Sequence, residues 1–151
     1  MAELKERLRT DLSAAMRARD RVRMRTLRSA LTAVTNEEVA GKAARELSDD
    51  EVLKVLTREG KKRREAAEAF AAGNRPELAE RERAEGEVIA AYLPAQLSDD
   101  ELRDFVTQAV ASAGASGPQA MGAVMKVVNP LVAGRADGGR VAAEVKRQLA
   151  S

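Results

Sequence analysis

The sequence predicts an all-α protein, and three observations lead to this class. Its 151 residues include only two Phe, one Tyr and no Trp, so a core has to be built from Leu, Val, Met and Ala. Alanine, leucine, glutamate and arginine are strong helix formers, and β-branched residues do not gather into the runs typical of strands. Apolar residues also recur at the three- and four-residue spacing of helices. We expect an N-terminal long-helix module at residues 1–93, followed by a small C-terminal three-helix module at residues 98–151.

The N-terminal stretch carries apolar stripes at helical spacing, which predict helix over residues 3–39. Asp20 could begin a second helix, because aspartate is a preferred N-cap residue. The alternative is one continuous helix that runs to about Val39, and the pattern leaves both arrangements open. The stripes consist of Leu4, Leu8, Leu12 and Met16, then Met24, Leu27, Leu31 and Val34.

Two further helix starts are marked by capping boxes. In a capping box, a serine hydroxyl and a glutamate carboxylate satisfy opposite unpaired amides of the first turn. Ser48 with Glu51 forms one box and Ser98 with Glu101 forms the other, each within the pentapeptide Leu-Ser-Asp-Asp-Glu. Because the flanking residues differ, we interpret the repetition as reuse of a good helix start and not as an internal duplication.

The middle of the chain predicts a pair of helices. The first follows the earlier capping box and ends near Gly73-Asn74, and Pro76 suits the first turn of the second. Pro94 stops this second helix. Gly60 lies on the apolar face of the first helix, where glycine costs stability unless it allows close packing. We therefore expect a close helix crossing at Gly60.

A glycine-rich turn precedes the last helix of the C-terminal module. Gly134 suits the left-handed conformation that closes the preceding helix, Asp137 is a plausible N-cap, and Gly138 completes the turn. This role is structural and needs no ligand. We expect the three helices of the module at residues 98–112, 117–129 and 138–150.

The absence of two residue types narrows the chemistry. The chain contains no Cys and no His, which excludes disulfides, the usual zinc sites, thiol nucleophiles and imidazole acid–base catalysis. No phosphate loop, dinucleotide fingerprint or nucleophile elbow is present either. We therefore predict no metal, no cofactor and no catalytic residue.

The N-terminus predicts a protein that is neither secreted nor inserted in a membrane. It is amphipathic and lacks the apolar stretch of a secretory signal. No apolar run along the chain is long enough to span a bilayer. We expect a cytoplasmic protein with no membrane partner.

Basic residues are concentrated in the N-terminal third. Residues 1–47 hold 11 Lys/Arg against 7 Asp/Glu, so an anionic partner would be attracted there first. Four arginines of this stretch would share one face of a helix and could grip successive phosphates of a nucleic acid. The alternative is a solvated face whose arginines pair with carboxylates of neighbouring helices. The four are Arg17, Arg21, Arg25 and Arg28.

Arg63 differs from its neighbours in the basic cluster Lys61–Arg64. It projects onto the apolar side of its helix, whereas glutamates at three- and four-residue spacing surround the other cations. Such a guanidinium must reach water along its aliphatic stem or meet a carboxylate from another helix. We expect a structural ion pair, with a ligand contact as the alternative.

Six motifs occur along the chain in an order that resembles the stand-alone YqeY-like proteins of the GatB/YqeY family. The resemblance covers nearly the whole chain. It implies an all-helical fold similar to the helical and tail portions of the B subunit of the tRNA-dependent amidotransferase. The motifs are Leu47–Glu51, Lys61–Phe70, Arg75–Ala79, Tyr92–Pro94, Ser116–Gly122 and Gly134–Gly138.

The resemblance links the chain to carbon–nitrogen ligation with glutamine as amide donor. The large catalytic portion of the amidotransferase subunit has no counterpart in this sequence, so no catalytic residue of the family can be carried over. The similar tail of that subunit is understood to contact tRNA. By this resemblance, the cations around the last turn become candidate RNA contacts. They are Lys126, Arg135, Arg140, Lys146 and Arg147.

The leading hypothesis is a small helical protein that binds tRNA, or a complex that modifies or aminoacylates tRNA, through its tail and the N-terminal arginines. A second hypothesis is a helical protein-interaction module with no RNA role. A third is an enzyme with amidotransferase activity of its own, for which no nucleophile is visible.

Overall fold

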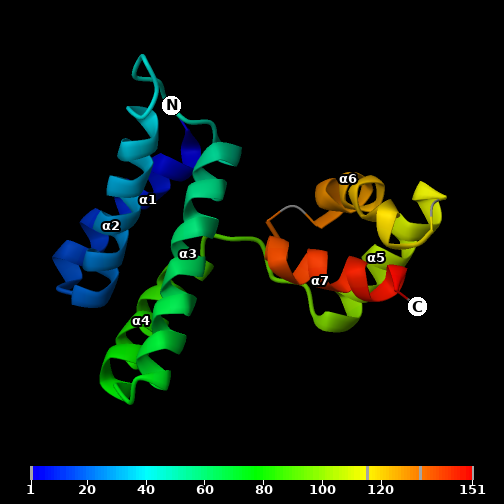
Figure 1. Ribbon diagram of the computed structural model, residues 1–151. Coiled ribbons are helices and arrows are strands. Elements are labelled where there is room, and N and C mark those ends of the chain that lie inside the picture. Colours follow the sequence, from blue (N-terminus) through cyan, green and yellow to red (C-terminus); the bar gives the residue numbers. More distant parts are fainter. Residues whose placement is uncertain (1, 115, 133, 151) are drawn as a thin grey trace. The chain divides into compact units, whose positions relative to one another are not determined.

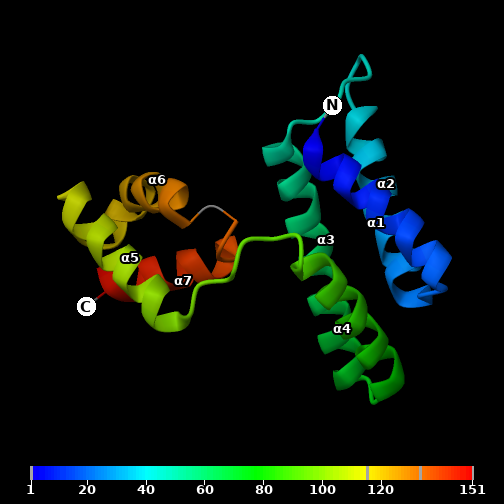
Figure 2. The ribbon, with the colours of Figure 1, turned by 180° about the vertical axis from the view of Figure 1, so that it is seen from behind.

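The computed structural model describes residues 2–114, 116–132 and 134–150. Within these ranges the regular structure consists of seven α-helices and one short 3-10 helix, with no strand. The all-α prediction is therefore confirmed. The contacts divide the chain into two compact units, Met1–Leu93 and Pro94–Ser151, whose helices are labelled in Figures 1 and 2.

The N-terminal unit begins with two helices, α1 (Glu3–Ala18) and α2 (Arg21–Glu38). Between them Arg19 adopts a left-handed conformation with φ of 57°. The Asp20 carboxylate accepts a hydrogen bond from the backbone N–H of Arg23 at 3.2 Å. Aspartate therefore starts a second helix, and of the two arrangements left open by the sequence, the broken one is present.

Helices α3 (Asp49–Ala72) and α4 (Pro76–Ala90) form a hairpin, and they lie side by side in both views (Figures 1 and 2). Gly60 of α3 and Gly86 of α4 each face the other helix of this hairpin. A Cβ atom at Gly60 would lie 3.6 Å from Ile89 Cγ2, and one at Gly86 would lie 3.6 Å from Arg63 Cβ. Both distances are ordinary van der Waals contacts, so a Cβ would fit at either position and the packing does not require the glycine-dependent close crossing expected at Gly60.

An apolar core joins the four helices of the N-terminal unit. Leu8, Val34, Val52 and Leu56 have no exposed surface, and burying each side chain of this size contributes about 1.5–3 kcal/mol. A charged pair lies beside this core. The Lys5 ammonium is 2.8 Å from Glu38 Oε1, with the two side chains 9% and 11% exposed.

The C-terminal unit consists of α5 (Asp99–Ala113), a 3-10 turn (Pro118–Ala120), α6 (Met121–Val132) and α7 (Gly138–Leu149). Helix α6 continues through Pro130, three residues beyond the end expected from the sequence at residue 129. A proline inside a helix removes one hydrogen bond, and burial of Val132 against the core holds the last turn in place.

The first residues of the C-terminal unit are fastened to the turn before α7. Leu97 N–H donates to the Arg135 carbonyl at 2.7 Å, and the Gln96 side-chain amide donates to the Gly134 carbonyl at 3.1 Å. Gly134 has φ of 74°, a conformation that favours glycine. Residues 94–97, expected to be a boundary segment, therefore group with the C-terminal unit.

Both capping boxes are present, one at the start of α3 and one at the start of α5. In each, the serine hydroxyl accepts from the glutamate N–H and the glutamate carboxylate accepts from the serine N–H. Glu51 has an additional partner in Arg45, whose guanidinium donates to both carboxylate oxygens at 3.0 and 2.6 Å. The pKa of Glu51 is lowered to about 2. Hydrogen bonding to Arg45 is the largest cause, and the hydrogen bond from the Ser48 amide is the second.

Candidate functional site

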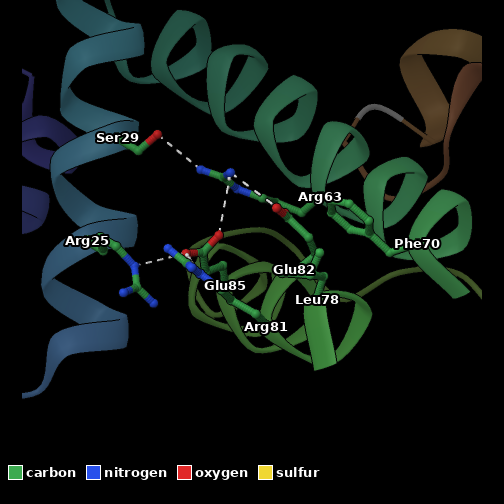
Figure 3. Close-up of a pocket in the computed structure, with 8 residues that line it drawn as sticks. All are labelled: Arg25, Ser29, Arg63, Phe70, Leu78, Arg81, Glu82 and Glu85. Atoms are coloured by element: carbon green, nitrogen blue, oxygen red, sulfur yellow. Dashed lines mark hydrogen bonds and ion pairs between the residues drawn. The ribbon is translucent and has the colours of Figure 1, made fainter. Parts of the chain in front are cut away.

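Three helices of the N-terminal unit enclose a charged pocket of about 350 Å³. Figure 3 shows that its charged groups point toward one another, with side chains supplied by α2, α3 and α4. The volume lies at the lower end of the range of small-molecule sites. The lining residues are Arg25, Ser29, Arg63, Phe70, Leu78, Arg81, Glu82 and Glu85.

Glu85 lies at the centre of this pocket, and its side chain is only 7% exposed. Arg25 Nε donates to it at 3.2 Å from α2. The guanidiniums of Arg63 and Arg81 are 3.5 and 3.8 Å away, from α3 and α4. Removing a carboxylate from water is costly unless opposite charges surround it, and here guanidiniums from three helices do so.

Arg63 and Glu82 each have a polar atom that no neighbouring group satisfies. Arg63 Nη2 donates to Ser29 Oγ at 3.0 Å, and Arg63 Nη1 is 3.7 Å from Glu82 Oε2, too far for a hydrogen bond. Arg63 Nε and Glu82 Oε2 are buried and have no hydrogen-bond partner among the described residues. The two side chains are therefore joined by an ion pair without a hydrogen bond, and the two atoms lie beneath the surface of the pocket.

The ion pair expected for Arg63 is present, because both glutamates near it come from another helix. The sequence reasoning missed those glutamates, although a signal existed. Glu82 and Glu85 fall at helical spacing between Leu78 and Ile89, on the apolar face of α4. Two acids inside an apolar stripe indicate buried carboxylates that need cationic partners from a neighbouring helix.

A second charged pocket, of about 370 Å³, lies between α1, α2 and the end of α4. The Tyr92 hydroxyl donates to Asp11, and the Arg7 guanidinium lies 4.6 Å from the centre of the Tyr92 ring. Burial, followed by the bond to Asp11, raises the pKa of Tyr92 to about 12. Tyr92 is thus held as a neutral donor that ties the end of α4 to α1.

The arginine ridge expected at residues 17–28 is not one helical face, because the chain breaks at Arg19 and Asp20. Arg17 lies on α1, whereas Arg21, Arg25 and Arg28 lie on α2. All four are exposed. Arg25 is held by Glu85, while the other three form no ion pair within the part of the chain that the structure describes.

The three candidate arginines of the C-terminal unit each have a partner within that unit. Arg140 donates to Asp99 at 2.9 Å and to the Leu97 carbonyl at 3.0 Å, so it fastens α7 to the start of α5. Arg147 donates to Glu144 at 2.7 Å. The Arg135 guanidinium is 6.0 Å from the centre of the Phe105 ring.

The two tail lysines, by contrast, are exposed. Within residues 2–114, 116–132 and 134–150, neither Lys126 nor Lys146 forms an ion pair. In the turn between α6 and α7, Asp137 occupies the N-cap position and its carbonyl accepts from Val141 N–H at 3.1 Å. Gly138 is the first residue of α7.

In the described ranges, no three acidic side chains are grouped so that they could hold a metal ion. None of the described helices has the length and apolar character needed to cross a bilayer.

The chain is thus an all-helical protein of two units, with ion pairs lining the pockets between its helices. The family model described as Yqey-like protein matches residues 5–149, and the chain belongs to this family. The resemblance drawn from the sequence motifs is thereby confirmed.

Three curated relatives match the chain, each named "Altered inheritance of mitochondria protein 41, mitochondrial". That of Clavispora lusitaniae is 33% identical over 81% of this chain and 72% of its own length. That of Meyerozyma guilliermondii is 32% identical over 71% of this chain and 58% of its own length. That of Lachancea thermotolerans is 37% identical over 57% of this chain and 46% of its own length.

The expected cytoplasmic location was wrong in the light of these relatives, whose names point to mitochondria. The lack of a secretory signal excludes only secretion. An amphipathic, arginine-containing N-terminal segment does not distinguish the cytoplasm from mitochondria, because mitochondrial import signals are themselves amphipathic and rich in arginine.

Proposed function

We propose that this protein binds tRNA, or a complex that modifies or aminoacylates tRNA, and has no catalytic site of its own. The observation that carries the proposal is a set of exposed cations that no carboxylate among the described residues neutralises. Phosphate contacts by such cations supply most of the affinity for nucleic acid that is independent of sequence. Among the candidate cations named from the sequence, those in this situation are Arg17, Arg21, Arg28, Lys126 and Lys146.

The candidate cations differ in whether a carboxylate already holds them. Arg25, Arg140 and Arg147 would have to leave their carboxylates before they could bind phosphate. Arg17, Arg21 and Arg28 need no such rearrangement. The main RNA contacts therefore lie on α1 and α2, and the two tail lysines add a weaker contribution.

Few aromatic side chains are available to stack on bases, since the chain has two Phe and one Tyr. Binding therefore depends on charge, and its affinity falls steeply as salt rises. The family resemblance to the tail of the amidotransferase B subunit supports tRNA over other nucleic acids.

The test is fluorescence anisotropy of labelled bulk tRNA with the intact protein at two salt concentrations. The triple variant R17A/R21A/R28A is compared with R58A/R83A/R103A, which removes three exposed arginines that are held in ion pairs. Both variants lose the same charge. We expect the first to weaken binding at least about tenfold and to lower the salt dependence by roughly 0.7–0.9 per lost contact.

The double variant K126A/K146A should weaken binding by a smaller factor. Equal losses in both triple variants would contradict the proposal, because they would reduce it to nonspecific charge. A wild-type protein that does not bind tRNA at low salt would favour the helical protein-interaction module instead.

A further inference from the structure

The turn that joins α1 to α2, drawn in blue in Figures 1 and 2, is surrounded by arginines. We call residues 17–23 the α1–α2 corner. Its four arginines are exposed, and none of them forms an ion pair within the part of the chain that the structure describes. Asp20 is the one acid of this stretch, and its carboxylate accepts from a backbone N–H. The four arginines are Arg17, Arg19, Arg21 and Arg23.

Arg19 adopts a backbone conformation that arginine rarely takes. Its φ of 57° and ψ of 33° are left-handed, and at the end of a helix this conformation usually belongs to glycine. The Arg19 N–H donates to the Met16 carbonyl at 3.2 Å, and the Asp20 N–H donates to the Ala15 carbonyl at 3.0 Å. Among the described residues, the other non-glycine residue with positive φ is Asn74, and asparagine tolerates this conformation. The Cβ atom at position 19 therefore costs stability that glycine would avoid.

The two arginines of the corner that lie on α2 also oppose the dipole of that helix. Arg21 and Arg23 are in the first turn of α2, which contains no acid. The N-terminal end of a helix carries partial positive charge, so acids stabilise it and cations do not. The first turns of α1, α3, α4 and α5 each contain at least one acid. The corner therefore departs twice from the residues that would stabilise it.

A structural role does not account for the Arg19 side chain. A cation near the C-terminal end of a helix complements the dipole, but Arg17 already lies in the last turn of α1. The Arg19 side chain is exposed and has no carboxylate partner among the described residues. Strained residues of this kind are concentrated at binding sites. Guanidiniums without partners bind anions, and the fork of a guanidinium matches the oxygens of a phosphate.

We propose that the α1–α2 corner binds the phosphate backbone of the RNA and that Arg19 is a direct phosphate contact. This inference rests on the proposed binding of tRNA, and it adds Arg19 and Arg23 to the contacts of that surface. The chain turns at Arg19, so arginines from the end of α1 and from the start of α2 flank it. Successive phosphates of one strand supply the several anions that such a cluster needs.

The test compares Arg19→Gly with Lys42→Gly in the intact protein. Each variant loses one exposed cation from a connection between helices of the same unit, but Lys42 does not have a positive φ. Circular dichroism follows thermal unfolding, and fluorescence anisotropy of labelled bulk tRNA at low salt measures binding. Arg19→Gly should raise the unfolding midpoint by about 1–3 °C, because it relieves the left-handed strain.

The same substitution should weaken tRNA binding about three- to tenfold, because one phosphate contact is lost. Lys42→Gly should leave binding within about twofold of the wild type, since it removes only a distributed charge, and it should not raise the unfolding midpoint. Arg19→Lys retains a cation at the same place and should bind tRNA more tightly than Arg19→Gly does. This third variant separates loss of the charge from loosening of the turn.

Two results would overturn this inference and leave the proposed function intact. One is tRNA binding by the wild type with equal losses in Arg19→Gly and Lys42→Gly. The other is an unfolding midpoint of Arg19→Gly at or below that of the wild type, which would mean that position 19 is not strained. A wild-type protein that binds no tRNA is a separate outcome, and it would remove the proposed function together with this inference.

Discussion

The two units of this protein differ in where they place charge. The N-terminal unit buries Lys5, Glu38 and Glu85, and it encloses two pockets lined with ion pairs. In the C-terminal unit, every buried side chain among the described residues is apolar. Its ion pairs, such as that of Arg140 with Asp99, involve exposed carboxylates or arginines, and several of them line a shallow pocket of about 330 Å³.

The two units are therefore stabilised in different ways. Buried charges gain little over apolar side chains of the same size, yet removing one partner is strongly destabilising. The N-terminal unit therefore depends on matched pairs across its helices, and the C-terminal unit depends on close apolar packing. A unit that retains buried charge without a clear gain in stability is the better candidate for ligand binding.

The strongest loss of stability should come from the buried pair of Lys5 and Glu38 in the N-terminal unit. Lys5→Met leaves the Glu38 carboxylate buried without its ammonium partner and should lower the free energy of unfolding by about 3–5 kcal/mol. The matched control is Lys62→Met, whose pair with Glu59 involves a lysine side chain that is 75% exposed. That change should cost about 0–1 kcal/mol. Urea denaturation measures both, and equal costs would contradict the comparison.

Apolar packing should give the next largest effect, in the C-terminal unit. Leu102, 4% exposed, lies in the core of that unit, and Leu102→Ala should lower the free energy of unfolding by about 2–4 kcal/mol. Leu131→Ala removes a side chain that is 44% exposed and should cost far less. Thermal unfolding followed by calorimetry detects the change. A loss of the same size in both variants would show that this core is not closely packed.

Tyr92 should give a smaller effect, with a pH signature. Tyr92→Phe removes the bond to Asp11 and should cost about 1 kcal/mol. Because the folded pKa of about 12 lies above the ordinary value of 10, the stability from Tyr92 is present below pH 10 and is lost as pH rises toward 12.

The chain has a single tyrosine, so ultraviolet absorbance of tyrosinate titrates Tyr92 alone. The variant should lack the alkaline loss of stability that the wild type shows. A wild-type titration with a midpoint near the ordinary value would refute the buried bond.

The weakest effect should be a difference between the two capping boxes in how stability depends on acidic pH. The pKa of Glu51 is lowered from 4.5 to about 2, mainly by the Arg45 hydrogen bonds. Its contribution to stability is present above pH 4.5 and is lost as pH falls toward 2. Glu51→Gln should remove that acid loss in the N-terminal unit. Glu101 has a lowered pKa caused mainly by the Ser98 amide, without an arginine hydrogen bond.

Glu101→Gln should therefore change the acid dependence less than Glu51→Gln. Denaturation midpoints measured across this acidic range give both dependences. Equal changes in the two variants would mean that Arg45 adds nothing to the capping box.

Helix boundaries could be predicted because local residues set them. Ser48, Ser98 and Asp20 act on amides within one turn, and Pro76 fixes its own backbone angle. The end of α6 beyond Pro130 was not predicted, because burial of Val132 and not local preference holds the last turn of this helix. Tertiary packing decides such a turn.

The candidate site could be predicted only in part. The position of Arg63 on an apolar face indicated a carboxylate from another helix, and that partner is present. The apolar stripe of α4 indicated that Glu82 and Glu85 are buried acids, but which cation meets them depends on how the helices pack. The pair of Lys5 with Glu38, 33 residues apart, left no local pattern at all.

The bonds between residues 94–97 and the turn before α7 determine when the C-terminal unit can close during synthesis. The Leu97 N–H donates to the Arg135 carbonyl, and the Leu97 carbonyl accepts from Arg140, which lies 43 residues further along the chain. The ribosome releases α5 and α6 before these partners emerge, whereas the N-terminal unit has all its helices by Leu93. On the ribosome, then, the charged unit can be complete while the valine- and leucine-rich faces of α5 and α6 are still uncovered, which is the stage most exposed to aggregation and to chaperones.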